Sequence, residues 1–196
     1  MLFRFFNKNN LRGACGVALL SALSLAQTAS VSNCTPEEGV FFSCRLKENN
    51  RLISICTAPK NPPFASITYR YATGTKVEVT YAASSENQNR FMGTVSAVSP
   101  RATVRQVWFE LNGGKYIATS CVGGDCAYRG GLIVFRNGRL DLSQPCAEDA
   151  DGHPWFASDV VRFRSTLEKS RSNTDLIQLL DVDNDINVLY SGRKVN

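Results

Sequence analysis

Residues 103–142 read TVRQVWFELNGGKYIATSCVGGDCAYRGGLIVFRNGRLDL, and this stretch decides the fold. It contains two tight-turn signals, Asn112-Gly113-Gly114 and Asn137-Gly138. The central residues of such turns take positive φ angles, which glycine and asparagine adopt at low energetic cost. The stretch therefore predicts two consecutive β-hairpins, joined by a short loop that contains two cysteines.

The register of each hairpin follows from the pairing that collects the apolar residues on one face. In the first hairpin, pairing Leu111 with Lys115 gives a buried face made of Val107, Phe109, Leu111 and Ile117. The same register turns the neighbouring side chains to the opposite face: Trp108, Glu110, Tyr116 and Ala118. In the second hairpin, pairing Arg136 with Arg139 gives a buried face made of Ile133, Phe135, Leu140 and Leu142. Both registers predict an antiparallel sheet.

The preceding part of the chain continues this pattern. Segments 40–46 and 51–57 flank a turn at Asn49-Asn50, and segments 65–71 and 76–82 flank a turn at Gly74. Their side chains are rich in β-branched and aromatic residues, which is typical of strands, and segment 91–98 adds a further strand. We therefore expect residues 31–146 to form a mainly β domain, an antiparallel barrel or two-layer sandwich of about nine strands.

After Cys146 the pattern changes. Phe156, Val160, Phe163 and Leu167 recur at helical spacing, which predicts an amphipathic helix at residues 157–169. Residues 147–196 are therefore expected to form a C-terminal helical extension with a polar tail.

The first 26 residues have the layout of a secretory signal peptide, with Arg4, Lys8 and Arg12 ahead of an apolar run. That run is shorter than the ~20 residues of a membrane-spanning helix, so we expect no integral membrane segment in the mature chain. Cleavage fits after Ala26 or after Ser30. A periplasmic or secreted protein is the expected product.

Charge argues against a nucleic-acid partner. Removing residues 1–26 takes three of the 22 basic residues and none of the 17 acidic ones, which lowers the formal net charge from +5 to +2. So small a charge gives no reason to expect binding to nucleic acid or to an anionic membrane.

Cysteine usage fits an oxidising compartment. Loss of Cys15 with the signal leaves an even number, which favours disulfides: Cys34, Cys44, Cys56, Cys121, Cys126 and Cys146. Hairpin geometry favours pairing across each turn, so we expect the pairs Cys44–Cys56 and Cys121–Cys126, with Cys34–Cys146 remaining. Zinc is the alternative, but the spacings lack a repeated cysteine knuckle and His153 is the only histidine.

A resemblance adds to this interpretation. The runs FFSCRLKENNRLISIC, ITYRYATGTKVEVTY, VWFELNGGKYIATSC and GGLIVFRNGRL resemble an uncharacterised family of small exported proteobacterial β-rich proteins. The resemblance covers residues 41–146 and implies a bacterial, periplasmic protein, with no catalytic residue to carry over. A fainter similarity is to periplasmic lysozyme inhibitors, whose Ser-Gly…Tyr loop is not reproduced, because Ser191-Gly192 has no tyrosine after it.

The sequence contains few groups of residues that could form a catalytic or metal site. His153 with Asp149 and Asp151 is the candidate hydrolytic set, but the chain has no Gly-x-Ser-x-Gly elbow. Residues 181–187 space oxygen ligands as a calcium loop does, yet Ile186 occupies the position of the turn glycine. We expect no metal and no cofactor.

Four residues are candidates for binding: Trp108, Tyr116, Tyr128 and Arg129. Trp108 and Tyr116 share a sheet face in the expected register, and that face is either covered by the C-terminal helix or exposed for recognition. Tyr128 and Arg129 flank the cysteine loop, and both residue types are frequent anchors in protein interfaces.

The expected function is that of an exported, non-enzymatic binding protein of the cell envelope, with a protein partner. An inhibitor or immunity-type binder of a wall-degrading enzyme is one form of it. The alternatives are a hydrolase that uses Asp149, Asp151 and His153, and a structural envelope component.

Overall fold

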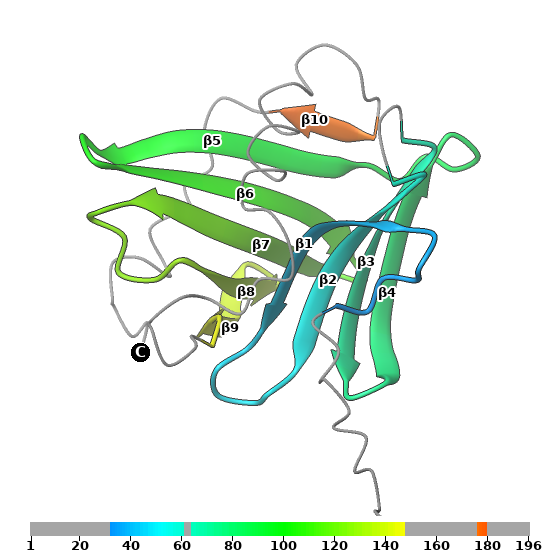
Figure 1. The fold of residues 1–196 in the computed structure, drawn as a ribbon, viewed down its shortest axis with the longest axis horizontal. Helices are drawn as coiled ribbons and strands as arrows, with labels where there is room; N and C mark the ends of the chain where they lie inside the picture. The colour runs from blue at the N-terminus through cyan, green and yellow to red at the C-terminus, as the bar shows by residue number, and fades with distance from the viewer. Residues whose placement is uncertain (1–31, 61–63, 148–175, 180–196) are drawn as a thin grey trace, which may run out of the picture.

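A computed structural model describes residues 32–60, 64–147 and 176–179, and these residues are mainly β (Figure 1). The strands form two sheets. The four-stranded sheet contains β1 (Gly39–Arg45), β2 (Leu52–Ala58), β3 (Ser66–Thr73) and β4 (Lys76–Ser84) in that order. The six-stranded sheet has the order β10-β5-β6-β7-β8-β9, with bounds Ile177–Leu179, Phe91–Ser99, Ala102–Leu111, Gly114–Gly123, Gly130–Arg136 and Arg139–Pro145.

The predicted hairpins are present, and the two sheets pack against each other around one core. Tyr69 and Tyr81 reach into this core from the four-stranded sheet, and Phe109 and Tyr116 from the six-stranded sheet. The Phe109 ring stacks between Tyr81, at a centroid distance of 4.2 Å, and Tyr116, at 5.1 Å. Aromatic pairs at such distances add to the free energy of burial.

The sheets do not close into a barrel, so the barrel alternative is wrong and the two-layer arrangement holds. The two sheets meet along one side only through a single bridge between Leu46 and Cys146. Two backbone hydrogen bonds flank this bridge, from Lys47 N to Pro145 O (3.0 Å) and from Ala147 N to Arg45 O (2.6 Å). Along the rest of β1 and β9 the sheets are separate layers.

The first predicted register is wrong by one residue. Asn112 and Gly113 have φ angles of 51° and 73°, so a two-residue turn pairs Leu111 with Gly114 rather than with Lys115. Because side chains alternate along a strand, this shift moves Tyr116 and Ala118 to the core beside Phe109. The opposite face of the sheet instead carries Trp108 and Ile117.

The second register is correct at the turn and wrong beyond it. Arg136 pairs with Arg139, as expected, but the register shifts after Phe135. Leu142 consequently lies opposite Val134 in the core between the sheets, whereas Ile133, Phe135 and Leu140 lie on the other face.

Three disulfides are present, and two of the three expected pairings are wrong. Cys121 pairs with Cys126, as predicted, but the other bonds are Cys34–Cys56 and Cys44–Cys146. Cys44 lies opposite Ile53, and Cys56 is three residues further along β2, so the side chains of Cys44 and Cys56 point to opposite faces. Cys44 therefore reaches Cys146 in the core, and Cys56 reaches Cys34 outside it. The bonds fit an oxidising compartment.

Several predictions concern other parts of the chain. The signal peptide (1–26), the helix at 157–169 and the calcium-like loop at 181–187 lie outside the described residues. Among the residues that are described, no helix is long and apolar enough to cross a bilayer.

Candidate functional site

The four predicted binding residues do not form one patch. Trp108 is 5% exposed on the outer face of the six-stranded sheet, where Tyr128 packs against the same cluster and Lys115 Nζ lies 4.9 Å above the indole. Arg129 is exposed and donates to Gly123 O at 2.7 Å. Tyr116 lies on the opposite face, in the core. The catalytic candidates Asp149, Asp151 and His153 lie outside the described residues.

The β1–β2 and β3–β4 turns lie at the same end of the sandwich (Figure 1). Residues near these turns line a cavity that opens between the two sheets. Its volume is about 380 Å³, which is at the lower end of the range for small-molecule sites. Both sheets contribute to its wall: Asn49, Arg51, Tyr71, Glu78 and Val79 on one side, and Tyr116, Leu132, Val134, Arg136, Asp141 and Leu142 on the other.

On the four-stranded sheet, Arg51 is held by three partners at the mouth of this cavity. It donates to Tyr71 Oη at 2.9 Å and to Thr73 Oγ1 at 3.2 Å, and it pairs with Glu78 at 3.4 Å. The guanidinium also lies 5.2 Å from the centroid of the Tyr71 ring. The hydrogen bond with Tyr71 raises the pKa of Arg51 further, so the group is charged at every pH of interest.

The six-stranded sheet repeats this arrangement. Arg136 Nε donates to Asp141 Oδ2 at 2.7 Å, and Nη2 donates to Tyr116 Oη at 3.3 Å. The guanidinium lies 6.0 Å from the Tyr116 ring centroid. The cavity is therefore bounded by two sets of arginine, tyrosine and carboxylate, one from each sheet. We call them the Arg51 set (Arg51, Tyr71, Glu78) and the Arg136 set (Arg136, Tyr116, Asp141).

Both carboxylates of these sets sit at β-bulges. Tyr71 pairs with Val79 while the next residue, Ala72, pairs with Val77, so Glu78 is an extra residue on β4. In the same way Asp141 is an extra residue on β9, between Leu142, which faces Val134, and Leu140, which faces Phe135. A bulge redirects a side chain and is frequent next to functional sites.

The interior of the cavity is formed by apolar side chains. Leu132 and Val134 are buried there, and Val79 and Leu142 are half-buried. The Tyr69 hydroxyl is buried in the core and does not line the cavity, and no described residue forms a hydrogen bond with it. Burial raises the pKa of Tyr69 well above its usual value, and the nearby hydroxyls of Tyr71 and Tyr116 raise it further.

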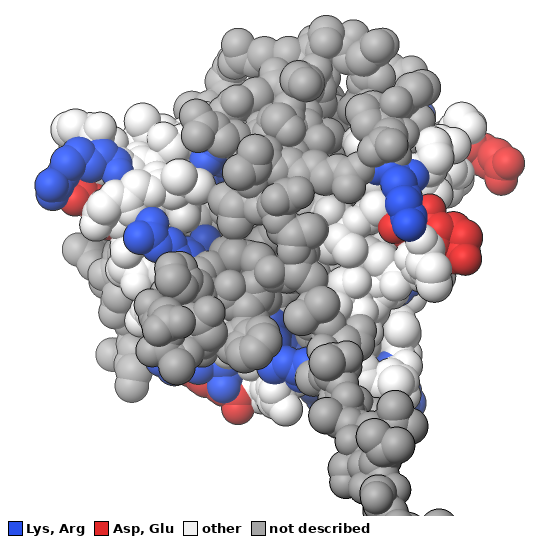
Figure 2. All heavy atoms as spheres, viewed as in Figure 1, with Lys and Arg blue, Asp and Glu red and all other residues white. Residues whose placement is uncertain are grey.

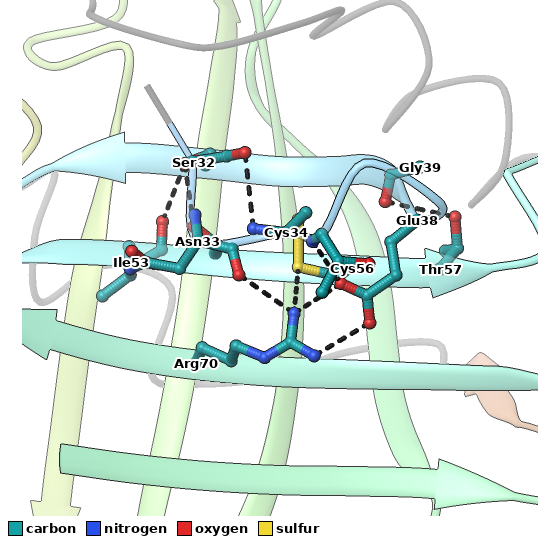
Figure 3. The surroundings of a disulfide bond; sticks show 12 residues. Ser32, Asn33, Cys34, Glu38, Gly39, Ile53, Cys56, Thr57 and Arg70 are labelled. Atoms are coloured by element: carbon teal, nitrogen blue, oxygen red, sulfur yellow. Dashed lines mark hydrogen bonds and ion pairs between the residues drawn. A yellow bond between two sulfur atoms is a disulfide. The ribbon is translucent and has the colours of Figure 1, made fainter. Parts of the chain in front are cut away.

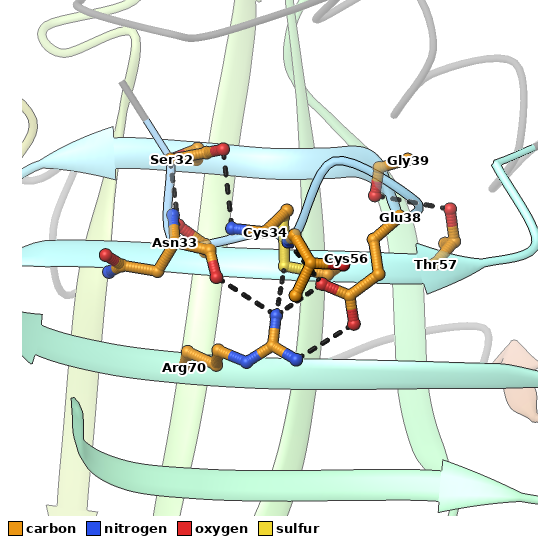
Figure 4. Close-up of polar contacts among 11 residues, drawn as sticks. Ser32, Asn33, Cys34, Glu38, Gly39, Cys56, Thr57 and Arg70 are labelled. Atoms are coloured by element: carbon orange, nitrogen blue, oxygen red, sulfur yellow. Dashed lines mark hydrogen bonds and ion pairs between the residues drawn. A yellow bond between two sulfur atoms is a disulfide. The ribbon is translucent and has the colours of Figure 1, made fainter. Parts of the chain in front are cut away.

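A second cluster surrounds the Cys34–Cys56 bond on the outer face of the four-stranded sheet (Figures 3 and 4). Arg70 donates to both oxygens of Glu38, at 2.6 and 2.8 Å, to Asn33 O at 3.0 Å and to Cys56 Sγ at 3.2 Å. Thr35 N donates to the same Glu38 carboxylate at 2.7 Å. We call this cluster the Arg70 clasp.

The clasp brings Sγ of Cys34, Sγ of Cys56 and a Glu38 oxygen within 4.8 Å of one another, which is close enough for shared metal ligation. However, the two sulfurs are bonded to each other, and metal binding to cysteine needs thiolates. The Arg70 guanidinium also occupies the approach to all three groups, so a cation would meet a positive charge there. The clasp therefore attaches the segment before β1 to the four-stranded sheet, and its role is structural.

Sequence reasoning missed both arginine sets at the cavity. It gave Arg136 only a pairing role and did not single out Arg51, Tyr71, Glu78 or Asp141. No local motif marks either set, because the arginine and the tyrosine of each set are far apart in the sequence. The β-bulges that bring Glu78 and Asp141 to the two arginines cannot be recognised from the alternation of apolar and polar residues in the sequence.

Figure 2 shows basic and acidic side chains intermixed on the described part of one face, without a continuous area of one sign. No protein-family model matches the chain, and the chain has no match among curated proteins or among solved structures.

Proposed function

We propose that this protein is an exported, non-enzymatic binding protein of the cell envelope that receives its ligand at the open end of the sandwich. The observation that carries the proposal is the pair of arginine–tyrosine–carboxylate sets, which come from opposite sheets and face one preformed cavity. A cavity with an apolar interior and a few fixed polar groups is the usual form of a small-molecule site.

Preorganisation supports binding as the role of these groups. Tyr71 and Glu78 hold Arg51, and Tyr116 and Asp141 hold Arg136, before any ligand arrives. A side chain that is already fixed loses less conformational freedom when a ligand binds. Arginine does not release its proton near neutral pH, so these groups are suited to recognition rather than to proton transfer.

The compartment is inferred from the cysteines. Three disulfides require oxidising conditions, and the signal-like residues 1–26 and the resemblance to exported proteobacterial proteins both favour the periplasm. An inhibitor of a wall-degrading enzyme is a form of this function in which a protein partner reaches the same open end.

A cavity-filling variant tests the proposal. Val79→Trp places an indole in the cavity, whereas Val77→Trp places one on the exposed side of the same strand, where Val77 is 41% exposed. Wild-type protein and both variants would be purified natively from periplasm and analysed by mass spectrometry for bound small molecules and proteins. We expect a ligand with the wild type and with Val77→Trp, and none with Val79→Trp.

Two outcomes would contradict the proposal. One is wild-type protein that carries no small molecule and no stoichiometric protein. The other is a ligand that Val79→Trp retains in full while its circular dichroism and unfolding curve match those of the wild type.

A further inference from the structure

We infer that the ligand of this cavity is a small amphipathic anion, with a carboxylate or phosphate head and an apolar stem. The inference rests on the proposed function and adds the chemical class of the ligand. It follows from an inventory of the hydrogen-bonding groups that the cavity leaves unused.

The first step concerns the two tyrosine hydroxyls at the mouth. Tyr71 Oη accepts hydrogen bonds from Arg51 and, at 3.4 Å, from Asn49 Nδ2. Tyr116 Oη accepts from Arg136. Because guanidinium and amide nitrogens are the donors in these bonds, each phenol keeps its own O–H hydrogen, and neither donates it to a described residue.

The second step adds the remaining donors. Nη1 of Arg136 has no partner among the described residues, since Nε and Nη2 make the two bonds of that side chain. The buried, unpaired hydroxyl of Tyr69 adds no donor, because Tyr69 does not line the cavity. The unused groups at this end are therefore mainly donors, and two of the side chains that supply or hold them carry full positive charge.

The third step concerns the acceptors. Glu78 forms an ion pair with Arg51 through Oε2, at 3.4 Å, and accepts a hydrogen bond from Thr73 Oγ1 at Oε1, at 2.7 Å. Asp141 uses one oxygen for Arg136. A ligand head rich in acceptors thus meets two free O–H groups and two guanidiniums, whereas a cationic head meets two carboxylates that are already paired with these arginines. Charge-assisted hydrogen bonds to arginine are stronger than neutral ones, which favours an anion.

The stem is assigned from the apolar part of the wall. Val79, Leu132, Val134 and Leu142 offer aliphatic surface from both sheets and no polar side-chain atom. An alkyl chain fits such a surface by the hydrophobic effect. The ligand is therefore expected to bind with its head at the two arginines and its chain between the sheets.

Four ten-carbon probes separate the alternatives: decanoate, decyl phosphate, decanol and decyltrimethylammonium, each below its micellar concentration. Isothermal titration calorimetry on the disulfide-bonded protein would give their affinities. We expect at least one anion to bind about tenfold more tightly than decanol, because a hydrogen bond to a charged group is worth about 1.4 kcal/mol or more. The tighter of the two anions identifies the head group as carboxylate or phosphate.

Variants assign the contact. Arg51→Gln with Arg136→Gln should lower the affinity of the anion by about tenfold or more. Arg101→Gln is the matched control, because Arg101 also pairs with a carboxylate, Asp125 at 2.6 Å, but does not line the cavity. This variant should bind the anion with the affinity of the wild type.

Equal binding of decanol and the anions, preferential binding of the cation, or full anion affinity in the double variant would overturn the inference. If neither anion binds while native protein carries a ligand that Val79→Trp loses, the ligand class is wrong and the binding function stands. If the anions bind and Val79→Trp abolishes that binding, both proposals hold.

Discussion

The Arg70 clasp and the open end of the sandwich use the same residue types for different purposes. In the clasp the side chains of Arg70 and Glu38 are 18% and 13% exposed, and Arg70 makes four hydrogen bonds within the described residues. At the open end Arg51 and Arg136 are 38% and 53% exposed, and hydroxyls beside them keep unused hydrogens. An arginine–carboxylate pair that is buried and saturated holds the fold together, whereas one that is exposed and unsaturated remains available to a ligand.

Strand regularity separates the two regions as well. Arg70 is paired in register on both sides, opposite Ser54 on β2 and Thr80 on β4. Glu78 and Asp141 each sit at a bulge. Bulges interrupt backbone pairing and redirect side chains, and these two place both carboxylates at one cavity.

The largest effect is expected from the disulfide beside the open end. Cys44–Cys146 closes a loop with a sequence separation of 102, against 22 for Cys34–Cys56 in the clasp. The loop-entropy model gives a stabilisation of about 4.7 kcal/mol for the first bond and about 3.4 kcal/mol for the second. Replacing each pair by alanines should lower the free energy of unfolding in that order, as urea titration would measure.

The same two variants also test the division of roles. Loss of Cys44–Cys146 should weaken ligand binding at the cavity, because the bond joins the two sheets on one side of it. Loss of Cys34–Cys56 should leave ligand affinity unchanged in protein that remains folded. The reverse pattern would show that the clasp, and not the open end, is the binding region.

The next effect concerns the arginines themselves. Arg70→Met should lower the free energy of unfolding by about 3 kcal/mol, because it leaves the buried Glu38 carboxylate without its partner. Arg51→Met and Arg136→Met remove exposed pairs, so each should cost less than about 1 kcal/mol. Urea titration of the three variants gives the comparison. A loss at Arg136 as large as that at Arg70 would show that the open end is also a structural joint.

Acid titration gives a smaller effect at the clasp. Burial raises the pKa of Glu38, but hydrogen bonds from Arg70 and from the Thr35 backbone, together with the Arg70 charge, outweigh it and hold this pKa below 4.5. In the unfolded chain the pKa returns to about 4.5. The stability from this group is therefore complete above pH 4.5 and is lost as the pH falls through the lower, folded-state pKa.

Thermal unfolding of the wild type and of Glu38→Gln between pH 7 and pH 2 would measure this contribution. The wild type should be the more stable at pH 7, and the difference in stability should shrink as the pH falls below 4.5. A constant difference across the whole range would mean that the Glu38 charge does not contribute.

The smallest effect comes from single hydroxyls. Tyr81 Oη donates to Arg90 O at 2.9 Å and accepts from Arg90 N at 3.1 Å, so Tyr81→Phe should cost about 1 kcal/mol. Tyr69→Phe removes a buried hydroxyl without a partner and should leave ligand-free protein equally stable or slightly more so. Equal losses in both variants, measured by urea titration, would indicate that the Tyr69 hydroxyl has a partner.

The hairpins could be predicted from the sequence because individual asparagine and glycine residues mark their turns. Asn112, Gly113, Asn137 and Gly138 all adopt positive φ, as the turn signals required. It failed at the length of the first turn, since Asn112-Gly113-Gly114 is compatible with two or with three loop residues. One residue of difference exchanged the faces of Tyr116 and Ile117.

The candidate site was harder to predict from the sequence than the fold was. Alternation describes regular strands, and Glu78 and Asp141 depart from it through bulges that depend on the partner strand. The disulfides failed for a related reason, because two cysteines near the same turn are partners only when their side chains share a face. Cys121 and Cys126 could be paired because the short loop between them is sufficient by itself.

The position of β10 has a consequence for the order in which the sheet is completed during folding. β10 pairs in parallel with the outer side of β5, while β9 lies at the far edge of the same sheet (Figure 1). Until residues 177–179 are in place, the outer edge of β5 offers unpaired backbone groups to any neighbouring strand. A chain that lacks residues 177–179 would therefore be prone to aggregation through this edge. β10 is the last strand in the sequence, and it covers the edge of a sheet whose other strands are already paired.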